Sequence, residues 1–518
     1  MRIVETLKRK TVDVRERAFI IICSSLFWGI FAHGMMIFNK FSFHDDIAVF
    51  FGTSGIKGGV SQGRWMCGLY GTLLSGLFGH DFSIPLYKGL VSFLFIGIAW
   101  ILISDLMELK NKFGLIAVSG ILVVISSITS IFGYIYMALY YTFGLLLSVS
   151  GSYLVCKGRK LFNYCMGSVL IVCAVGTYQL FFAAAICVML LFMYKEVVDR
   201  KCDIKEFVLS SLRLLGIAII CLAVYMVITK LVCAISGIPL TNYKNIDKMG
   251  LVEIDEYISR AKTAYGAFIN PNRYVCDIPY PNASIILYHI LVGFLLFTIA
   301  LYFISFFREH NWQAAIEIVL LTSILPIALN LVFLLSGDSG VIQFYCHVFL
   351  YILLLFLVER IARNMYKTGK WYVGCAIGFI LILNLSFCRF SNACYLKAEL
   401  LQEHAISYFN ELGTRIHSVE GYTNDTQIAW IAPREKRDVN SVPQQFDGIR
   451  LAPYGVETII NDYQWTSFMW IWTGYVFQVS EKDFSDRPEV KLMPTYPDDG
   501  SIKMIDGVIV VKFGVQEN

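Results

Sequence analysis

Apolar positions along this chain gather into long runs instead of alternating with polar positions over short distances. A run of about twenty apolar residues is the length that crosses a bilayer as a helix. Such runs lie at residues 18–38, 84–106, 113–131, 134–155, 161–176, 178–194, 210–234, 285–306, 313–335, 341–360 and 371–389. The pattern therefore predicts a polytopic α-helical membrane protein with about eleven spans.

Two apolar segments fit a simple span less well. The stretch from 161 to 194 is too long for one membrane helix and short for two, so we expect a hairpin of short helices there. The segment WMCGLYGTLLSGLF at 65–78 is apolar but too short to cross a bilayer. It predicts a helix that lies on the membrane interface or dips into it.

Composition agrees with a membrane protein and excludes some other classes. Of 518 residues, 57 % are hydrophobic and 16 % are charged, and the mean hydropathy is +0.61. A soluble protein of this length needs more charge to cover its surface. The net charge of +4 is too small to indicate nucleic-acid binding, and the fourteen cysteines show no spacing that demands a disulfide or a metal.

The distribution of lysine and arginine predicts the topology. With the N-terminus inside, the inner segments hold most of these cations and the outer loops hold few, which is the positive-inside rule. The inner set is Arg2, Lys8, Arg9, Lys10, Arg15, Arg17, Lys110, Lys112, Lys157, Arg159, Lys160, Lys195, Arg200, Lys201, Lys205, Arg308, Arg360, Arg363, Lys367 and Lys370. We expect a multi-pass protein of the cell membrane with a cytoplasmic N-terminus and an extracytoplasmic C-terminal domain.

The chain is predicted to form two domains. Residues 1–389 form the transmembrane domain, with large outer loops at 39–83 and 236–284. In residues 390–518 the charge density rises and the apolar runs shorten, so we expect a small α+β domain on the outer face. Residues 391–419 have the spacing of an amphipathic helix. TQIAWIAP, VETIINDY and SIKMIDGVIVVKF are predicted strands, the last with an Asp506-Gly507 turn.

Two adjacent acids, Asp45 and Asp46, open the first outer loop. Loop carboxylates are usually solvated, or they cap a short helix. Here apolar residues flank the pair, and a membrane helix ends seven residues before it. A partly desolvated carboxylate suits a general base that takes a proton from a hydroxyl attacking a lipid-bound electrophile. The neighbouring His44 either tunes this pair or is merely exposed.

A lipid phosphate that leaves in such a reaction needs cations close to it. The candidates on the outer side are Arg64, Arg260, Lys262 and Arg273. Arg64 and Trp65 fit a phosphate contact and a stacking face for a sugar, or alternatively an interfacial anchor.

Polar side chains inside or at the ends of spans have two interpretations. Tyr178 and Gln179, and likewise Gln343 and His347, either join helices or line a donor cavity. No His, Cys, Asp and Glu residues have metal-ligand spacing. Two adjacent aspartates could hold Mg²⁺, but arginine and lysine can stabilise the departing phosphate, so we expect no required metal or other cofactor.

Four ordered stretches carry a resemblance to a known family. They are HDDI followed by SQGRW, GTYQLFF at 176–182, SNACYLKAELLQEHAISYFNEL after the last span, and MPTYPDDGSIKMIDGVIVVKF near the end. With the many spans, they resemble the GT-C glycosyltransferases. Within these the chain is most similar to the bacterial and phage-borne serotype-converting glucosyltransferases (Gtr type).

The resemblance implies an inverting hexosyltransferase. It would move glucose from a polyprenyl-phosphate carrier onto a surface polysaccharide such as an O-antigen, at the outer face of the membrane. Asp45 or Asp46 would be the general base, with Asp45 favoured, and a donor synthase and a flippase would act upstream. Where we expect a basic residue near the start of the tenth span, this chain has Gln343 and His347. That departure leaves donor-phosphate binding and the identity of the sugar open.

Two other functions fit a polytopic chain. A transporter or flippase for lipid-linked glycans would carry ionisable groups at the membrane midplane and related halves, and neither is visible here. A polysaccharide ligase or polymerase would depend more on arginines and a large outer loop than on an acid pair after the first span.

Overall fold

The computed structural model describes residues 2–41, 45–48, 56–79, 82–199, 203–242, 246–247, 249–250, 252–274, 280–338, 340–363, 366–431, 442–454 and 464–514. The chain divides into two compact units. The first comprises residues 1–39 and 51–392, and the second residues 40–50 and 393–518. The acid pair, which we expected in the transmembrane domain, is thus grouped with the C-terminal unit.

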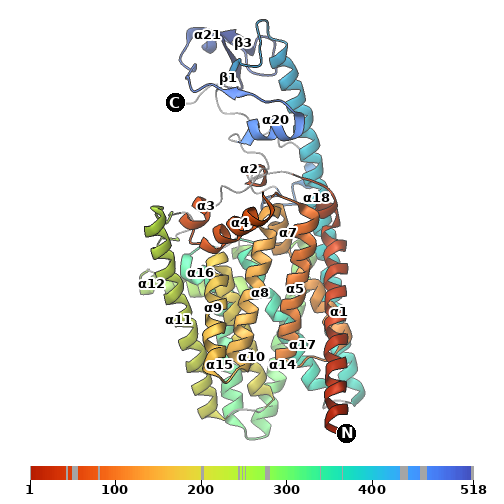
Figure 1. The fold of residues 1–518 in the computed structure, drawn as a ribbon. Helices are drawn as coiled ribbons and strands as arrows, with labels where there is room; N and C mark the ends of the chain where they lie inside the picture. The colour runs from red at the N-terminus through yellow and green to blue at the C-terminus, as the bar shows by residue number, and fades with distance from the viewer. Residues whose placement is uncertain are drawn as a thin grey trace. The chain divides into compact units, whose positions relative to one another are not determined.

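The first unit is a bundle of long apolar helices (Figure 1). The helices of the bundle are α1 (Arg2–Phe38), α5 (Pro85–Leu106), α6 (Lys112–Val124), α7 (Ser126–Gly133), α8 (Ile135–Lys157), α9 (Leu161–Thr177), α10 (Leu180–Val198), α11 (Ile204–Ser236), α14 (Asn282–Arg308), α15 (Trp312–Leu329), α16 (Leu331–Ser336), η2 (Gln343–His347), α17 (Val348–Ala362) and α18 (Tyr366–His417). The connecting segments add α3 (Ile56–Ser61), α4 (Trp65–Phe78), α12 (Ile254–Ile269) and α13 (Pro271–Tyr274).

In the described parts of the chain, nine helices are long and apolar enough to cross a membrane, and up to ten if the bent pair α6–α7 counts as one span. These nine correspond to nine of the eleven predicted spans. The predicted span 113–131 is the α6–α7 pair, which bends by 40°. The predicted span 161–176 is α9, which has only 17 residues. The chain is therefore a multi-pass helical membrane protein, and its number of spans stays a prediction.

Breaks in the helices expose backbone at defined places. Ile125 between α6 and α7 has φ −55° and ψ 146°, which interrupts the helical ladder. Tyr178 is extended, with φ −160° and ψ 134°, and separates α9 from α10. The predicted hairpin of short helices at 161–194 is present, and its turn presents Tyr178 and Gln179. Helix α4 forms where a short interfacial helix was expected, and it lies across the ends of the spans (Figure 1).

Burial separates the interior helices from the periphery. Every residue of α17 from Val348 to Arg360 is buried, as is most of α10. In contrast, α11 exposes a row of large apolar side chains, including Leu212, Leu215 and Ile219. In a membrane protein such a face contacts lipid, because no aqueous solvent penalises it.

Helix α18 has 52 residues and continues without a break past the end of the predicted last span at 389. At about 1.5 Å per residue it is about 78 Å long, far more than the roughly 30 Å of a bilayer core. The division between the two units falls within it, after Asn392. The tail helix expected at 391–419 is therefore the second half of α18, with its apolar face buried as Ala398, Leu401, Ala405, Phe409, Leu412 and Ile416.

The second unit contains a four-stranded sheet in the order β2-β1-β4-β3. Its strands are β1 (Gln427–Ile431), β2 (Gln478–Val479), β3 (Ile502–Ile505) and β4 (Val508–Lys512). Strand β1 runs parallel to β2 and β4, whereas β3 and β4 form an antiparallel hairpin. Its turn residues Asp506 and Gly507 have positive φ, as the Asp-Gly signal predicts. The strand expected at 456–463 lies outside the described residues.

The sheet packs against irregular segments of the same unit. One small core joins Ala429, Ile431, Phe484, Val490, Met493, Val508 and Val510. The unit also contains the short helices α2 (Asp45–Ala48), η3 (Gln444–Phe446), α20 (Trp465–Thr473) and α21 (Pro488–Lys491). Helix α2, which carries the acid pair, contacts α20.

Candidate active site

Arg64 lies between α3 and α4 and is turned toward the bundle. Its Nη1 donates a hydrogen bond of 3.1 Å to the Tyr141 hydroxyl on α8. Its guanidinium carbon lies 4.5 Å from the centroid of the Tyr178 ring, and the Tyr141 and Tyr178 rings stack at 4.9 Å. Two aromatic side chains, from α8 and the α9–α10 turn, therefore hold the guanidinium by a cation–π contact and by one hydrogen bond to a neutral hydroxyl.

Hydrogen bonds to the backbone fix the loop that carries Arg64. The Gln179 Nε2 donates to the Gln62 carbonyl oxygen at 2.8 Å and to the Tyr225 hydroxyl at 2.9 Å. The Tyr225 hydroxyl in turn donates to the Gly63 carbonyl oxygen at 3.2 Å. Gly63 has φ +69°, which favours glycine because a side chain there is strained. Gln179 thus joins helices and also orients the loop before Arg64.

The charge of Arg64 has no carboxylate partner among the described residues. Its Nε and the indole Nε1 of the adjacent Trp65 are both buried and lack hydrogen-bond partners in that part of the chain. A buried N–H donor without an acceptor is costly unless a ligand satisfies it. The Trp65 ring packs directly on Gly176, where an added Cβ would lie 2.5 Å from the ring. The geometry suits an anion.

A small cavity of about 20 Å³ adjoins the guanidinium, enough for about one water molecule. Its lining is Arg64, Tyr178, Gln179, Leu180, Ile246, Met249, Val332, Ser336 and Gln343. Four of the residues singled out from the sequence, Arg64, Tyr178, Gln179 and Gln343, therefore meet here, although they come from three separate parts of the chain. The Gln343 Oε1 accepts a hydrogen bond from the backbone N–H of Gly340, which keeps this amide at the cavity wall.

His347, the second polar residue of η2, does not line this cavity. It is fully buried, stacks on Phe344 with 3.4 Å between ring centroids, and has its Nδ1 3.2 Å from the Phe344 carbonyl oxygen. These contacts describe a packed helix terminus. His44 lies outside the described residues.

The other three cations that were expected on the outer side are separate from Arg64. Arg260 on α12 forms an ion pair with Glu256, which neutralises its charge. It also donates a hydrogen bond of 3.1 Å to the Leu334 carbonyl oxygen and so links α12 to α16. Lys262 and Arg273 are exposed, and the Arg273 guanidinium lies 5.9 Å from the Tyr274 ring. None of these three cations lines the cavity.

The two acids of the pair have different surroundings within the second unit. Asp46 is 1 % exposed and accepts a hydrogen bond of 2.9 Å from the Lys40 ammonium. The Lys40 carbonyl oxygen accepts a further bond from the Gln402 amide at 3.1 Å. Asp45 begins α2 and is half-buried. The charge of Asp46 is therefore compensated locally, and Asp45 is the more accessible carboxylate.

The described residues contain no group of three His, Cys, Asp or Glu side chains that could hold a metal ion. The expectation that no metal is required stays a prediction.

The sequence did not single out three residues of the site: Gly63, Tyr141 and Tyr225. Tyr141 and Tyr225 sit in long apolar helices, where a tyrosine is ordinary core material. The only available signal was a hydroxyl that must find a partner inside a membrane helix. Gly63 belongs to the SQGRW stretch, but its role depends on a backbone angle.

Comparison with known families completes the description of this site. Neither curated proteins nor solved structures gave a match to the chain. The model of a family described as glucosyl transferase GtrII matches residues 34–358, more than half of the chain. The matched range contains the acid pair, Arg64, Trp65, Tyr178, Gln179 and Gln343, whereas the two tail stretches of the resemblance lie beyond it. The predicted resemblance to Gtr-type enzymes is confirmed, and the chain belongs to the GtrII family of glucosyl transferases.

Proposed function

We propose that this glucosyltransferase moves glucose from a polyprenyl-phosphate carrier onto a cell-surface polysaccharide at the outer face of the membrane. The observation that supports the phosphate donor is Arg64, a half-buried side chain with no carboxylate partner among the described residues. Its Nε and the neighbouring Trp65 indole N–H are buried and lack acceptors in that part of the chain. The proposed topology puts the N-terminus in the cytoplasm and the tail outside. A donor synthase and a flippase would supply the carrier.

The chemistry of this transfer has a defined change of charge. The acceptor hydroxyl loses its proton as its oxygen attacks the anomeric carbon, and the bond from that carbon to the phosphate oxygen breaks with inversion. The phosphodiester of the donor carries one negative charge, and the departing phosphomonoester carries up to two. A fixed cation near the phosphate therefore lowers the barrier, because it gains interaction energy as charge develops.

We assign the phosphate contact to Arg64. A guanidinium presents paired N–H groups that match phosphate oxygens, and Nε of Arg64 is available for such a bond. Trp65, Tyr178, Gln179 and Gln343 would surround the phosphate and the sugar. The present cavity holds about one water molecule, so a hexosyl phosphate has to displace lining residues. Of the lining residues, Ile246 and Met249 lie outside the helices.

We assign the general base to Asp45. It is half-buried at the first turn of α2, whereas Asp46 is buried against Lys40. A general base has to reach the proton of the acceptor hydroxyl, and Asp45 is the more accessible of the two carboxylates. Asp46 would then hold α2 in place through Lys40, and Asp45 would accept the proton.

The test is a transfer assay on the purified full chain in detergent. Polyprenyl-phosphate glucose and a surface polysaccharide are supplied, and release of polyprenyl phosphate and gain of hexose mass are followed. We expect transfer by the wild type, a loss of at least about 100-fold in Asp45→Asn, and a smaller loss in Asp46→Asn with reduced thermal stability. Full activity in Asp45→Asn would refute the assignment of the base. Transfer from a nucleotide sugar but not from the lipid would refute the donor.

A further inference from the structure

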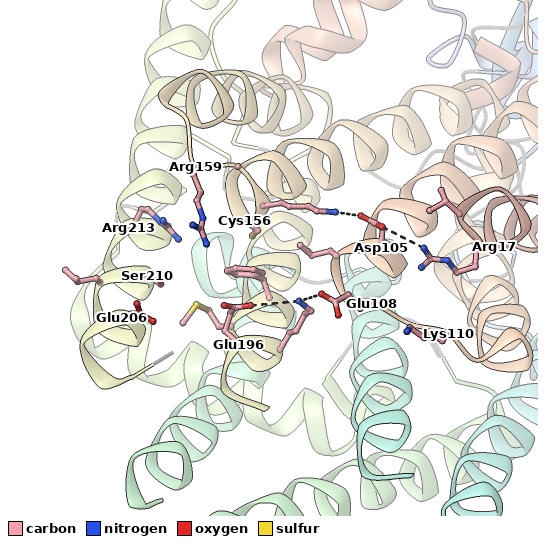
Figure 2. Close-up of a pocket in the computed structure, with 18 residues that line it drawn as sticks. Arg17, Asp105, Glu108, Lys110, Cys156, Arg159, Glu196, Glu206, Ser210 and Arg213 are labelled. Carbon is pink, nitrogen blue, oxygen red and sulfur yellow. Dashed lines mark hydrogen bonds and ion pairs between the residues drawn. The ribbon is translucent and has the colours of Figure 1, made fainter. Parts of the chain in front are cut away.

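A second and larger cavity lies at the end of the bundle where α1 begins. Its volume is about 950 Å³, and its wall comes from α1, α5, α8, α10, α11 and the loops between them (Figure 2). Helix α8 carries Tyr141, the partner of Arg64, near one end and Lys157, which lines this cavity, at the other. Sixteen residues of helix separate them, or about 24 Å. This cavity is therefore distinct from the candidate active site.

Charged side chains dominate the wall, with six basic and four acidic residues. The basic residues are Arg17, Lys110, Lys157, Arg159, Lys195 and Arg213. On the side formed by α1, α5 and α10, acids neutralise the cations. Asp105 pairs with Lys157 and lies 4.0 Å from Arg17, and Glu108 pairs with Lys195 at 3.0 Å.

Two arginines on the other side lack such partners. Arg159, in the loop between α8 and α9, makes no hydrogen bond or ion pair with any described residue. Arg213 on α11 donates only to the Tyr164 hydroxyl, at 3.1 Å, within the described chain. In Figure 2 both guanidinium groups point into the cavity. Glu196 and Glu206 also line the cavity, but neither forms an ion pair with Arg159 or Arg213 in the described chain. The two guanidinium groups repel each other, so an anion between them is favourable.

The surface next to these arginines is apolar and exposed. Leu161 and Phe162 begin α9 with 76 % and 70 % of their side-chain surfaces exposed, and Leu209 and Leu212 on α11 are 57 % and 60 % exposed. Leu209 also lines the cavity. In this membrane protein such side chains face hydrocarbon. The site thus combines an anion-binding end with a lipid-facing apolar flank.

We propose that this cavity binds the phosphate headgroup of an anionic phospholipid. Arg159 and Arg213 hold the phosphate, and the acyl chains lie on the exposed apolar surface of α9 and α11. Basic cavities between membrane helices bind lipid phosphates in this way, since a guanidinium meets phosphate oxygens through paired N–H groups. The apolar flank favours a lipid over free phosphate, because only a lipid also covers this surface.

The test measures lipid binding to the full chain, purified and delipidated in detergent, by native mass spectrometry. Phosphatidylglycerol is titrated against phosphatidylcholine of the same acyl chains. We expect retention of phosphatidylglycerol, and a loss of affinity of about tenfold to thirtyfold in Arg159→Gln/Arg213→Gln, since each cation near a lipid surface contributes about fivefold. The matched control is Lys160→Gln/Lys205→Gln, two exposed lysines that neighbour the wall but do not line the cavity.

Three results would overturn the proposal. Equal loss in the lysine control would mean that diffuse surface charge attracts the lipid. Equal retention of phosphatidylcholine, whose choline cation balances its phosphate, would mean that the net negative charge of the headgroup is not recognised. Protection against thermal unfolding by inorganic phosphate as strong as that by phosphatidylglycerol would assign the site to a soluble anion. If the double variant does not fold, Arg159→Gln alone decides, because this exposed side chain has no partner in the described chain to lose. We expect about a fivefold loss for it.

Discussion

Gly63→Ala is the substitution whose effect the structure predicts most specifically. Gly63 has φ +69°, and a Cβ built there lies 2.6 Å from the Tyr225 hydroxyl and 3.1 Å from the Gln179 Nε2. These are the two side chains that hold the loop before Arg64. Alanine therefore strains the backbone and also pushes apart the hydrogen bonds that position the guanidinium.

The two costs can be separated. The left-handed conformation costs an L-residue about 1–2 kcal/mol, and insertion of a methyl group into a packed site costs about 1–3 kcal/mol. Gly237→Ala isolates the first cost, because Gly237 has φ +68° and open space around its Cβ position. The excess cost of Gly63→Ala over Gly237→Ala is then about 1–3 kcal/mol. If this excess cost is lost from the stabilisation that Arg64 gives to the transition state, transfer slows about fivefold to 100-fold.

The assay compares thermal unfolding and the rate of polyprenyl phosphate release for both variants. We expect Gly237→Ala to lose stability and keep its rate, and Gly63→Ala to lose both. Adding Tyr225→Phe removes the oxygen atom that the new Cβ meets, so the double variant should be less impaired than the sum of its single changes. Equal rates in Gly63→Ala and Gly237→Ala would refute the idea that this network positions Arg64.

Three further predictions concern packing and charge in the two units. Gly176→Ala puts a methyl group 2.5 Å from the Trp65 ring and should cost about 1–3 kcal/mol of stability, seen as a lower midpoint of thermal unfolding; an unchanged midpoint would contradict this packing. Lys397→Met removes an ammonium that donates to three backbone carbonyls of residues 446–454. The loss should cost roughly 2 kcal/mol of stability, so limited proteolysis should cut the tail faster than in wild type. Asp46→Asn removes the carboxylate that pairs with the Lys40 ammonium and should lower the midpoint of thermal unfolding. The double variant Lys40→Met/Asp46→Leu should restore part of that loss, and no recovery would argue against the ion pair.

Apolar run length predicted most spans, because a bilayer demands about twenty apolar residues per helix whatever the tertiary contacts. It did not predict the break at Ile125, which stands before Ser126 and Ser127 in a mostly apolar run without proline. The continuity of α18 across residue 389 could have been predicted from the sequence, because no glycine or proline stands between Cys388 and Ser391 to end a helix. The domain boundary at 389 was instead drawn where composition changes.

The members of the candidate site were predicted one by one, but their convergence was not. A polar or cationic residue in apolar surroundings is conspicuous, which singled out Arg64 and Gln179. Their contacts with Tyr141 and Tyr225 depend on how α8 and α11 are rotated, and apolar patterning leaves that rotation open when helices are apolar on all sides. The pairing of Arg260 with Glu256, in contrast, has the i, i+4 spacing that a sequence reveals.

The central claim is that the Arg64 guanidinium binds the phosphate of the lipid donor. Its most direct test is the affinity of the purified protein for polyprenyl phosphate, the proposed leaving group, in wild type and Arg64→Gln, with the exposed Arg273→Gln as the matched control. Loss of a charge-assisted hydrogen bond of about 1.5–3 kcal/mol predicts a Kd about tenfold to 100-fold higher for Arg64→Gln and an unchanged Kd for Arg273→Gln. An unchanged Kd in Arg64→Gln, for a protein that still folds, would contradict the account.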